Sequence, residues 1–185
     1  MKNIFLKLSI FLLAIYINPV FASTLDEQIA KYQIDTPRIK QIIALTTNDI
    51  NQPTKQIHDE FWGLLLTRFN KTDVYELSNQ LKNSYVEPLQ YQLELWTCIK
   101  ESSVNHKVVI TQKLTEFRTK VPQSNITKDY EEKQNQMLIS AANGTLYKLR
   151  NGDEVKLNAV YASNNIAKIK TAKNRLEKLL NANWE

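Results

Sequence analysis

The stretch TKQIHDEFWGLLLTRF, residues 54–69, decides the fold class of this chain. Apolar side chains recur in it at the spacing of one helix face: Ile57, Phe61, Leu64 and Leu65. Further apolar residues widen that face almost around the helix: Trp62, Leu66 and Phe69. We therefore predict a central helix here, with Phe61 and Leu65 buried together one turn apart.

Helix start and stop signals flank this segment on both sides. Thr36-Pro37 offers a capping hydroxyl and a proline in the first turn, and the helix that it starts fades near Thr47. A weaker helix is expected over residues 24–33. After the central segment, apolar periodicity predicts a helix over 74–85, and Glu87-Pro88 is expected to start a separate one.

The second half of the chain carries similar signals. Ser102-Ser103 is expected to cap a helix that ends at Pro122, with two apolar faces. These faces would comprise Val104, Val108 and Thr111 on one side, and Ile110, Leu114, Phe117 and Val121 on the other. Thr127 is expected to cap the next helix, which Asn143-Gly144 ends.

Two interpretations of residues 145–161 stay open. Apolar residues alternate on both sides of Asn151-Gly152, which favours a β-hairpin over residues 145–157. Alternatively, Asn151-Gly152 ends one helix and the acidic pair Asp153-Glu154 starts another. A final helix is then expected after a cap at residues 163–165.

The composition also favours helices. Three glycines in 185 residues are few for a sheet-rich domain, which needs glycine at turns and bulges. The expected fold class is therefore mainly α, an antiparallel bundle or array of short helices with the hairpin as its one β element. We expect residues 23–185 to form a single domain.

The first residues predict export. Lys2 and Lys7 accompany a mostly apolar run over residues 8–17, and Val20-Phe21-Ala22 suits signal peptidase cleavage before Ser23. Ten residues rise about 15 Å as a helix, half of a hydrocarbon core of about 30 Å. We expect residues 1–22 to be a secretory signal peptide, with no transmembrane anchor left after cleavage and a periplasmic or secreted product of bacterial origin.

The residues typical of catalytic and metal sites are scarce. His58 and His106 lack the spacing of a zinc site, and the single cysteine, Cys98, has no intrachain partner for a disulfide. With three glycines, a phosphate-cradling loop is absent as well. The sequence therefore predicts no catalytic, metal or cofactor-binding residues and no cofactor, and it does not decide whether Cys98 is buried or reactive.

The C-terminal helix holds the residues that we expect to bind a partner. Residues 145–185 contain eight Lys and Arg against four Asp and Glu. We select Lys168, Lys170 and Lys173 for their charge, and Trp184 as an aromatic anchor. An envelope protein or an anionic envelope component would suit them. Nucleic acid is not expected, because the cations are not interleaved with aromatic residues.

The leading hypothesis is an exported, non-enzymatic binding module. Two alternatives remain, which are an enzyme whose site assembles only in three dimensions and a carrier of a small apolar ligand. A pocket that gathers His58, Glu94, Arg118 or Cys98 would favour the enzyme. An uncharged apolar cavity would favour the carrier, and a filled core the binding module.

Overall fold

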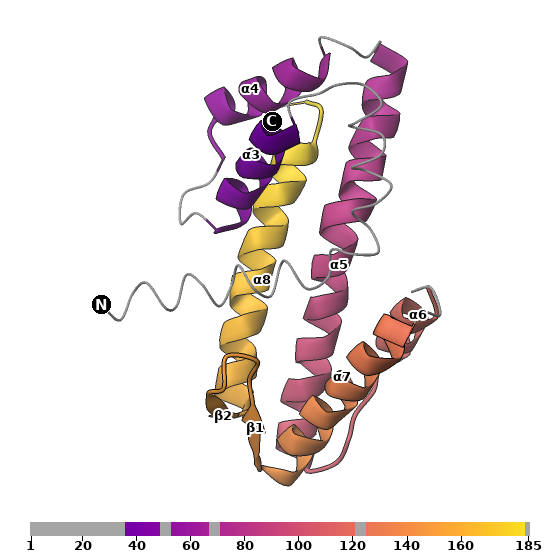
Figure 1. The fold of residues 1–185 in the computed structure, drawn as a ribbon, viewed down its shortest axis with the longest axis vertical. Helices are drawn as coiled ribbons and strands as arrows, with labels where there is room; N and C mark the ends of the chain where they lie inside the picture. The colour runs from indigo at the N-terminus through magenta and orange to yellow at the C-terminus, as the bar shows by residue number, and fades with distance from the viewer. Residues whose placement is uncertain (1–35, 49–52, 67–70, 121–124, 184–185) are drawn as a thin grey trace, which may run out of the picture. The chain divides into compact units, whose positions relative to one another are not determined.

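The computed structural model of the chain describes residues 36–48, 53–66, 71–120 and 125–183. These residues confirm a mainly α fold with one β-hairpin (Figure 1). In chain order the elements are α3 (Thr36–Asn48), α4 (Lys55–Leu66), α5 (Lys71–Asn105), α6 (Gln112–Lys120), α7 (Asn125–Asn143), β1 (Leu146–Lys148), β2 (Glu154–Lys156) and α8 (Ala159–Leu180). The expected signal peptide, the expected helix over 24–33 and Trp184 lie outside the described residues.

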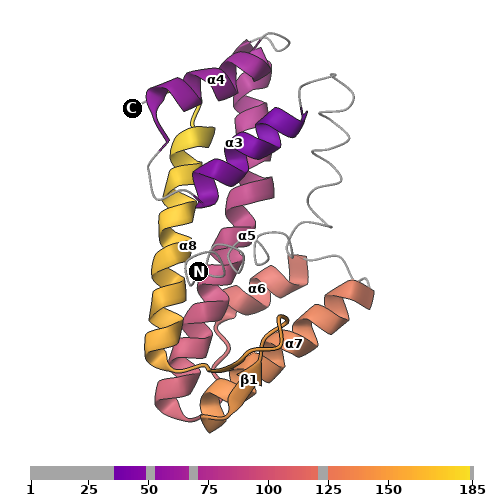
Figure 2. The same cartoon turned by 60° about the vertical axis from the view of Figure 1, so that its left-hand side comes forward.

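The chain divides into two compact units. Unit 1 contains α3, α4, the part of α5 up to Pro88 and the part of α8 from Thr171 onward. Unit 2 is the continuous segment Leu89–Lys170 and contains the rest of both helices, with α6, α7 and the hairpin. Within unit 1, α3 and α4 lie beside the end of α8 (Figures 1 and 2). The single domain expected over residues 23–185 stays a prediction.

The central helix of unit 1 is α4. Thr54 caps it, since its Oγ1 accepts a hydrogen bond from the Ile57 backbone N–H at 3.2 Å. Phe61 and Leu65 are 0% and 1% exposed, which confirms that they are buried together. Such burial contributes about 1.5–3 kcal/mol for each side chain.

The break expected at Glu87-Pro88 is wrong, because α5 continues through Pro88 for 35 residues. Proline removes one backbone hydrogen bond and crowds the preceding turn. Buried residues on both sides, Val86 and Tyr91 among them, hold the helical backbone in place despite this cost. The expectation of uniformly short helices fails with it, as α8 also spans 22 residues.

The helix expected from Ser103 to Val121 is wrong in its first part. His106 adopts a left-handed backbone with φ 54°, and residues 106–111 are not helical. The buried Ser102 hydroxyl accepts a hydrogen bond from the Val109 N–H at 2.9 Å, which draws the chain back toward α5. Thr111 then caps α6, its Oγ1 accepting from the Leu114 N–H at 3.3 Å.

The predicted end of α7 and the hairpin are confirmed. Gly144, with φ 65°, donates to the Ala141 carbonyl, and Thr145 donates to the Ser140 carbonyl, which together form a Schellman motif. β1 and β2 then pair antiparallel, with Tyr147 opposite Val155. The alternative with two helices over residues 145–161 is therefore excluded.

The final helix begins earlier than expected. Asn158 caps α8, because its Oδ1 accepts from the Tyr161 N–H at 2.8 Å, and the expected cap at residues 163–165 lies inside the helix. Unit 2 has its own apolar core, against which Tyr161 packs. Its fully buried members include Ile99, Leu114, Leu138 and Leu157.

Candidate functional site

A network of polar side chains lies in the interior of unit 2. Gln134, on α7, is 2% exposed, and its Oε1 accepts from the Tyr91 hydroxyl of α5. Arg118, on α6, donates from Nη2 to Gln134 Oε1 at 3.4 Å and to Asn135 Oδ1 at 3.1 Å. Its Nη1 lies 3.6 Å from Glu131 Oε1. One buried amide thus receives donors from two other helices.

Burial raises the pKa of both tyrosines in this network. The pKa of Tyr91 is raised mainly by desolvation, against the opposing effect of its hydrogen bonds with Gln134 and Arg118. Desolvation raises the pKa of Tyr130 to about 12. Both hydroxyls are therefore neutral at physiological pH. In that state they donate hydrogen bonds and pack against aromatic neighbours, and neither is a ready general base.

Aromatic contacts enclose the same network. The rings of Tyr91 and Phe117 meet edge to face with centroids 5.7 Å apart, and Tyr130 lies 6.3 Å from Tyr91. Lys120 Nζ lies 5.4 Å from the centre of the Phe117 ring. The network thus joins α5, α6 and α7 through both polar and aromatic contacts.

Cys98 is buried rather than reactive. Its side chain is 0% exposed, and desolvation raises the pKa of the thiol. Its Sγ lies 3.7 Å from Thr111 Oγ1, and the Thr111 hydroxyl donates to Glu94. A catalytic cysteine needs a lowered pKa and a cationic or histidine partner, and Cys98 lies beside a carboxylate instead. The thiol therefore stays protonated.

His58 belongs to a structural contact in unit 1. It is 4% exposed, and its Nε2 donates to the carbonyl of Asn181 at 2.7 Å. Trp62 donates from Nε1 to the Leu179 carbonyl at 3.0 Å, and Ser78 donates to the Leu180 carbonyl at 2.5 Å. Three side chains therefore satisfy carbonyls at the end of α8, and at the residue that follows it, that have no partner within the helix.

The residues of unit 2 that were named for an enzyme site make separate contacts. Cys98 and Glu94 meet Thr111, whereas Arg118 binds Gln134 and its neighbours on α7. His58 belongs to the other unit. Within the described ranges, His, Cys, Asp and Glu form no group able to hold a metal ion. The helices described here also include none long and apolar enough to cross a membrane.

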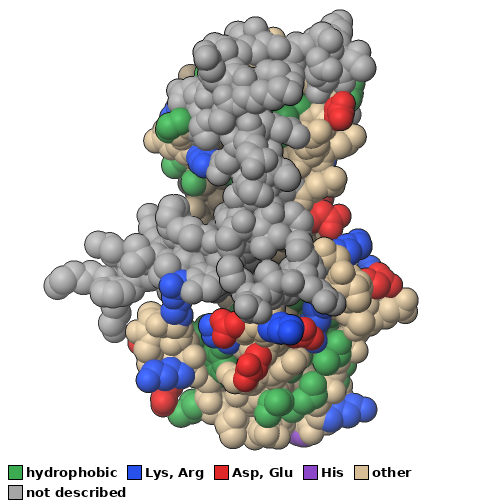
Figure 3. All heavy atoms as spheres, turned by 45° about the vertical axis from the view of Figure 1, so that its right-hand side comes forward, with side chains coloured by type: hydrophobic (Ala, Val, Ile, Leu, Met, Phe, Trp, Pro, Cys, Tyr) green, Lys and Arg blue, Asp and Glu red, His purple; other side chains and the backbone are tan. Residues whose placement is uncertain are grey.

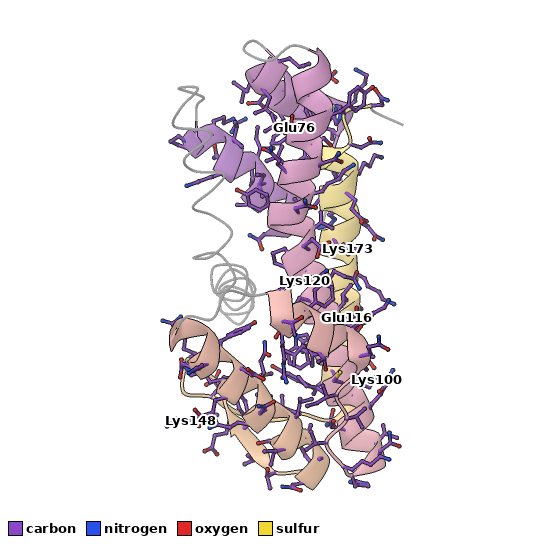
Figure 4. The ribbon with its side chains drawn as sticks, turned by 90° about the vertical axis from the view of Figure 1, so that its right-hand side faces the viewer. Glu76, Lys100, Glu116, Lys120, Lys148 and Lys173 are labelled. Atoms are coloured by element: carbon purple, nitrogen blue, oxygen red, sulfur yellow. The ribbon has the colours of Figure 1, made fainter. Side chains whose placement is uncertain are left out.

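The predicted cations lie on α8 in different settings. Lys168 and Lys170 are exposed and make no ion pair with the described part of the chain. Two residues apart, they project about 200° from one another around the helix. Lys173 is partly buried and pairs with Glu177 across 2.7 Å; its position is labelled in Figure 4. Trp184 lies outside the described residues.

Sequence reasoning missed an exposed apolar surface between α5 and α6. We call residues 104–111, from the last two residues of α5 to the residue before α6, the α5–α6 segment. Its side chains Val104, Val108 and Ile110 are 60%, 46% and 44% exposed, although the periodicity had placed them on helix faces. The adjacent β-branched residues of Val108-Val109-Ile110 are a local signal for extended backbone that the helical interpretation outweighed.

Comparison with known proteins gives no relative. No family model, no curated protein and no solved structure matches the chain.

Proposed function

We propose that this protein is an exported, non-enzymatic binding module that recognises a partner in the cell envelope through the α5–α6 segment. The signal-like sequence of residues 1–22 supports export. The observation that carries the binding function is the exposure of three large apolar side chains within seven residues of unit 2: Val104, Val108 and Ile110.

Exposed apolar side chains are common one at a time, but several in one short segment favour an interaction surface. On the face that Figure 3 shows, hydrophobic side chains lie exposed beside charged ones. Two hydrogen bonds hold the α5–α6 segment in place. The Ser102 hydroxyl accepts from the Val109 N–H, and the Thr111 hydroxyl accepts from the Leu114 N–H at the start of α6. A fixed surface loses little conformational entropy when it binds.

The interior of unit 2 gives weaker support to the other two hypotheses. Its buried thiol and tyrosines have raised pKa values, which disfavours a nucleophile or a base there. Its large apolar side chains pack into one core cluster. These observations support a binding module over an enzyme or a carrier.

Site-specific photo-crosslinking in cells tests this function. A photoreactive amino acid is placed singly at Val108, at Val160 in the same unit and at Tyr75 in unit 1. The two control positions are 69% and 60% exposed, so accessibility does not favour Val108. We expect one discrete adduct from Val108 and none from the controls. If none of the three positions gives an adduct, the protein is not a binding module of this kind.

Export has a separate test. The N-terminus of the protein recovered from the envelope or the medium is sequenced, and Ser23 is expected as its first residue. A chain that keeps Met1 and stays in the cytoplasm would contradict the proposed location without affecting the binding surface.

A further inference from the structure

We propose that Asn151, in the turn of the β-hairpin, is a site of spontaneous covalent modification, at which the side-chain amide is converted to aspartate or isoaspartate. This inference goes beyond the proposed binding function and does not depend on it. The chain contains two Asn-Gly pairs, Asn143-Gly144 and Asn151-Gly152. They share the same reactive groups, but the first lies at the end of α7 and the second in the hairpin turn.

The reaction joins an asparagine side chain to the glycine that follows it. The backbone nitrogen of the glycine loses its proton to solvent and attacks the Cγ of the asparagine. A new C–N bond forms, the bond from Cγ to the side-chain nitrogen breaks, and ammonia leaves with a proton from solvent. Water then adds to either carbonyl of the cyclic succinimide and opens it, leaving aspartate or isoaspartate. Glycine favours ring closure because it has no Cβ to crowd the attacking nitrogen.

The hairpin turn leaves this reaction little to overcome. Residues 150–154, between β1 and β2 in Figure 1, are all exposed. Two hydrogen bonds close the turn, from the Gly152 N–H to the Leu149 carbonyl at 3.0 Å and from the Leu149 N–H to the Asp153 carbonyl at 2.7 Å. Only the first has to open, because the Gly152 nitrogen is the attacking atom. Local openings in exposed turns cost little free energy.

The Asn151 amide is also activated where it lies. Its Oδ1 accepts a hydrogen bond from the Asp153 N–H at 3.2 Å, and its Nδ2 donates to Asp153 Oδ2 at 2.7 Å. The first of these bonds draws electron density toward Oδ1, which makes Cγ a better electrophile. It also stabilises the negative charge that develops on Oδ1 during the attack, as donors do in an oxyanion hole.

The other Asn-Gly pair is protected by its position. Asn143 is exposed, but it is the last residue of α7, and ring closure requires its backbone to leave the helical conformation. That change breaks the two hydrogen bonds that Gly144 and Thr145 make in the Schellman motif. Ala141 and Ala142, only 2% and 5% exposed, fix the preceding turn in the core. We therefore expect Asn143 to react at least about tenfold more slowly than Asn151 in the folded protein.

Modification changes the turn in two ways. The new carboxylate takes the place of the amide that donated to Asp153 at 2.7 Å, and like charges this close repel one another. Isoaspartate also lengthens the backbone by a carbon atom, which disturbs the hydrogen bond between Leu149 and Asp153. Tyr147 and Val155 of the hairpin pack against the core of unit 2, so a loosened turn weakens the packing there.

Ageing of the purified protein at mildly alkaline pH tests the proposal. Parallel samples are kept folded and in denaturant, and peptide mapping by mass spectrometry follows the conversion of each Asn-Gly pair. In denaturant the two pairs should react at similar rates, because their chemistry is the same. In the folded protein Asn151 should react at least about tenfold faster than Asn143. A folded rate ratio no higher than the ratio in denaturant, or no conversion at Asn151, would overturn the proposal.

Matched variants assign the modification to its residue. Asn151→Ser keeps an oxygen that can accept from the Asp153 N–H but removes the amide, so conversion in the hairpin peptide should disappear. Asn143→Ser is the control at the other pair and should leave the conversion of Asn151 unchanged. Conversion that persists in the hairpin peptide of Asn151→Ser would place the reaction at another residue and reject the assignment.

Amide hydrogen exchange tests the effect on the hairpin. Exchange at Leu149, whose N–H donates across the turn, should quicken at least about tenfold in the modified protein. Asn151→Asp introduces the same charge with the backbone unaltered, so it should quicken exchange less. Exchange as slow as in the fresh protein would contradict the loosening of the turn. An effect of Asn151→Asp equal to that of the modified protein would reject the longer backbone as its cause.

Discussion

The two units bury polar side chains for different purposes. In unit 1, Trp62 and Ser78 donate to backbone carbonyls at the end of α8. In unit 2, Tyr91 and Arg118 donate to a side chain, the amide of Gln134. A carbonyl is present whatever residue occupies the acceptor position, so unit 1 depends on the position of a helix end. Unit 2 depends on the identity of one glutamine.

The largest expected loss of stability comes from a substitution in unit 1. Trp62 is 3% exposed, so Trp62→Ala should lower the free energy of unfolding by about 3–5 kcal/mol through lost burial and a cavity. Trp62→Phe keeps most of the volume and removes the indole donor, at a cost of about 1–3 kcal/mol. Denaturant unfolding measures both. Equal losses would show that the hydrogen bond to Leu179 carries the whole effect and would contradict the packing argument.

A smaller effect is expected from Gln134→Leu in unit 2. The substitution keeps the volume and removes the acceptor shared by Tyr91 and Arg118, which should cost about 1–3 kcal/mol. Gln134→Glu restores an acceptor beside the Arg118 guanidinium and should recover much of the loss. A leucine variant as stable as the parent protein would show that the network is dispensable.

High pH should lower the stability of unit 2 through the ionisation of Tyr130. The folded pKa of Tyr130 is raised to about 12, from an ordinary value of 10. The unfolded chain therefore ionises first, and stability is fully present below pH 10 and falls as the pH rises toward 12. The slope is about 1.4 kcal/mol for each pH unit. Unfolding followed against pH, with Tyr130→Phe as the control that reduces the slope, checks this. A curve with the same slope in both proteins would contradict it.

The smallest expected loss of stability comes from removing one hydrogen bond of unit 1. Ser78→Ala removes one donor to the Leu180 carbonyl and should cost about 0.5–1.5 kcal/mol. Hydrogen exchange of the backbone amides should quicken first in the last turn of α8, where the capped carbonyls lie. The same measurement on Gln134→Leu should quicken exchange on α7 instead. A reversed pattern would show that the two networks are not local.

The elements predicted correctly carry their signals within a few residues. Thr36-Pro37 starts α3, Gly144 ends α7, and Asn151-Gly152 marks the hairpin. In each of them the local backbone chemistry decides the structure. The sequence did not predict the hydrogen bonds of the hairpin turn. There Gly152, with φ 89°, follows Asn151, and its N–H donates to the Leu149 carbonyl.

The elements predicted wrongly depend on contacts between distant residues. Buried residues on both sides of Pro88 keep α5 helical through the proline. The Ser102 hydroxyl accepts a hydrogen bond from the Val109 N–H, which keeps that N–H out of a helical hydrogen bond. The exposure of the α5–α6 segment was not predicted either. Helical periodicity placed Val104 and Val108 on one helix face, and it outweighed the local signal of the β-branched residues 108–110, although the chain leaves the helix at His106.

The hydrogen-bond donors of unit 1 are synthesised well before the carbonyls at the end of α8 that accept from them. Trp62, Ser78 and His58 are made before Pro88, while the carbonyls that receive their hydrogen bonds, at Leu179, Leu180 and Asn181, are made near the end of the described residues. At a synthesis rate of about 5–20 residues per second, the donors wait roughly 5–20 s for their acceptors. Unit 2 lies wholly within that interval, so its sequence is complete before unit 1 is. A chain interrupted after Lys170 and before the end of α8 would therefore hold the complete sequence of unit 2 and an incomplete sequence of unit 1.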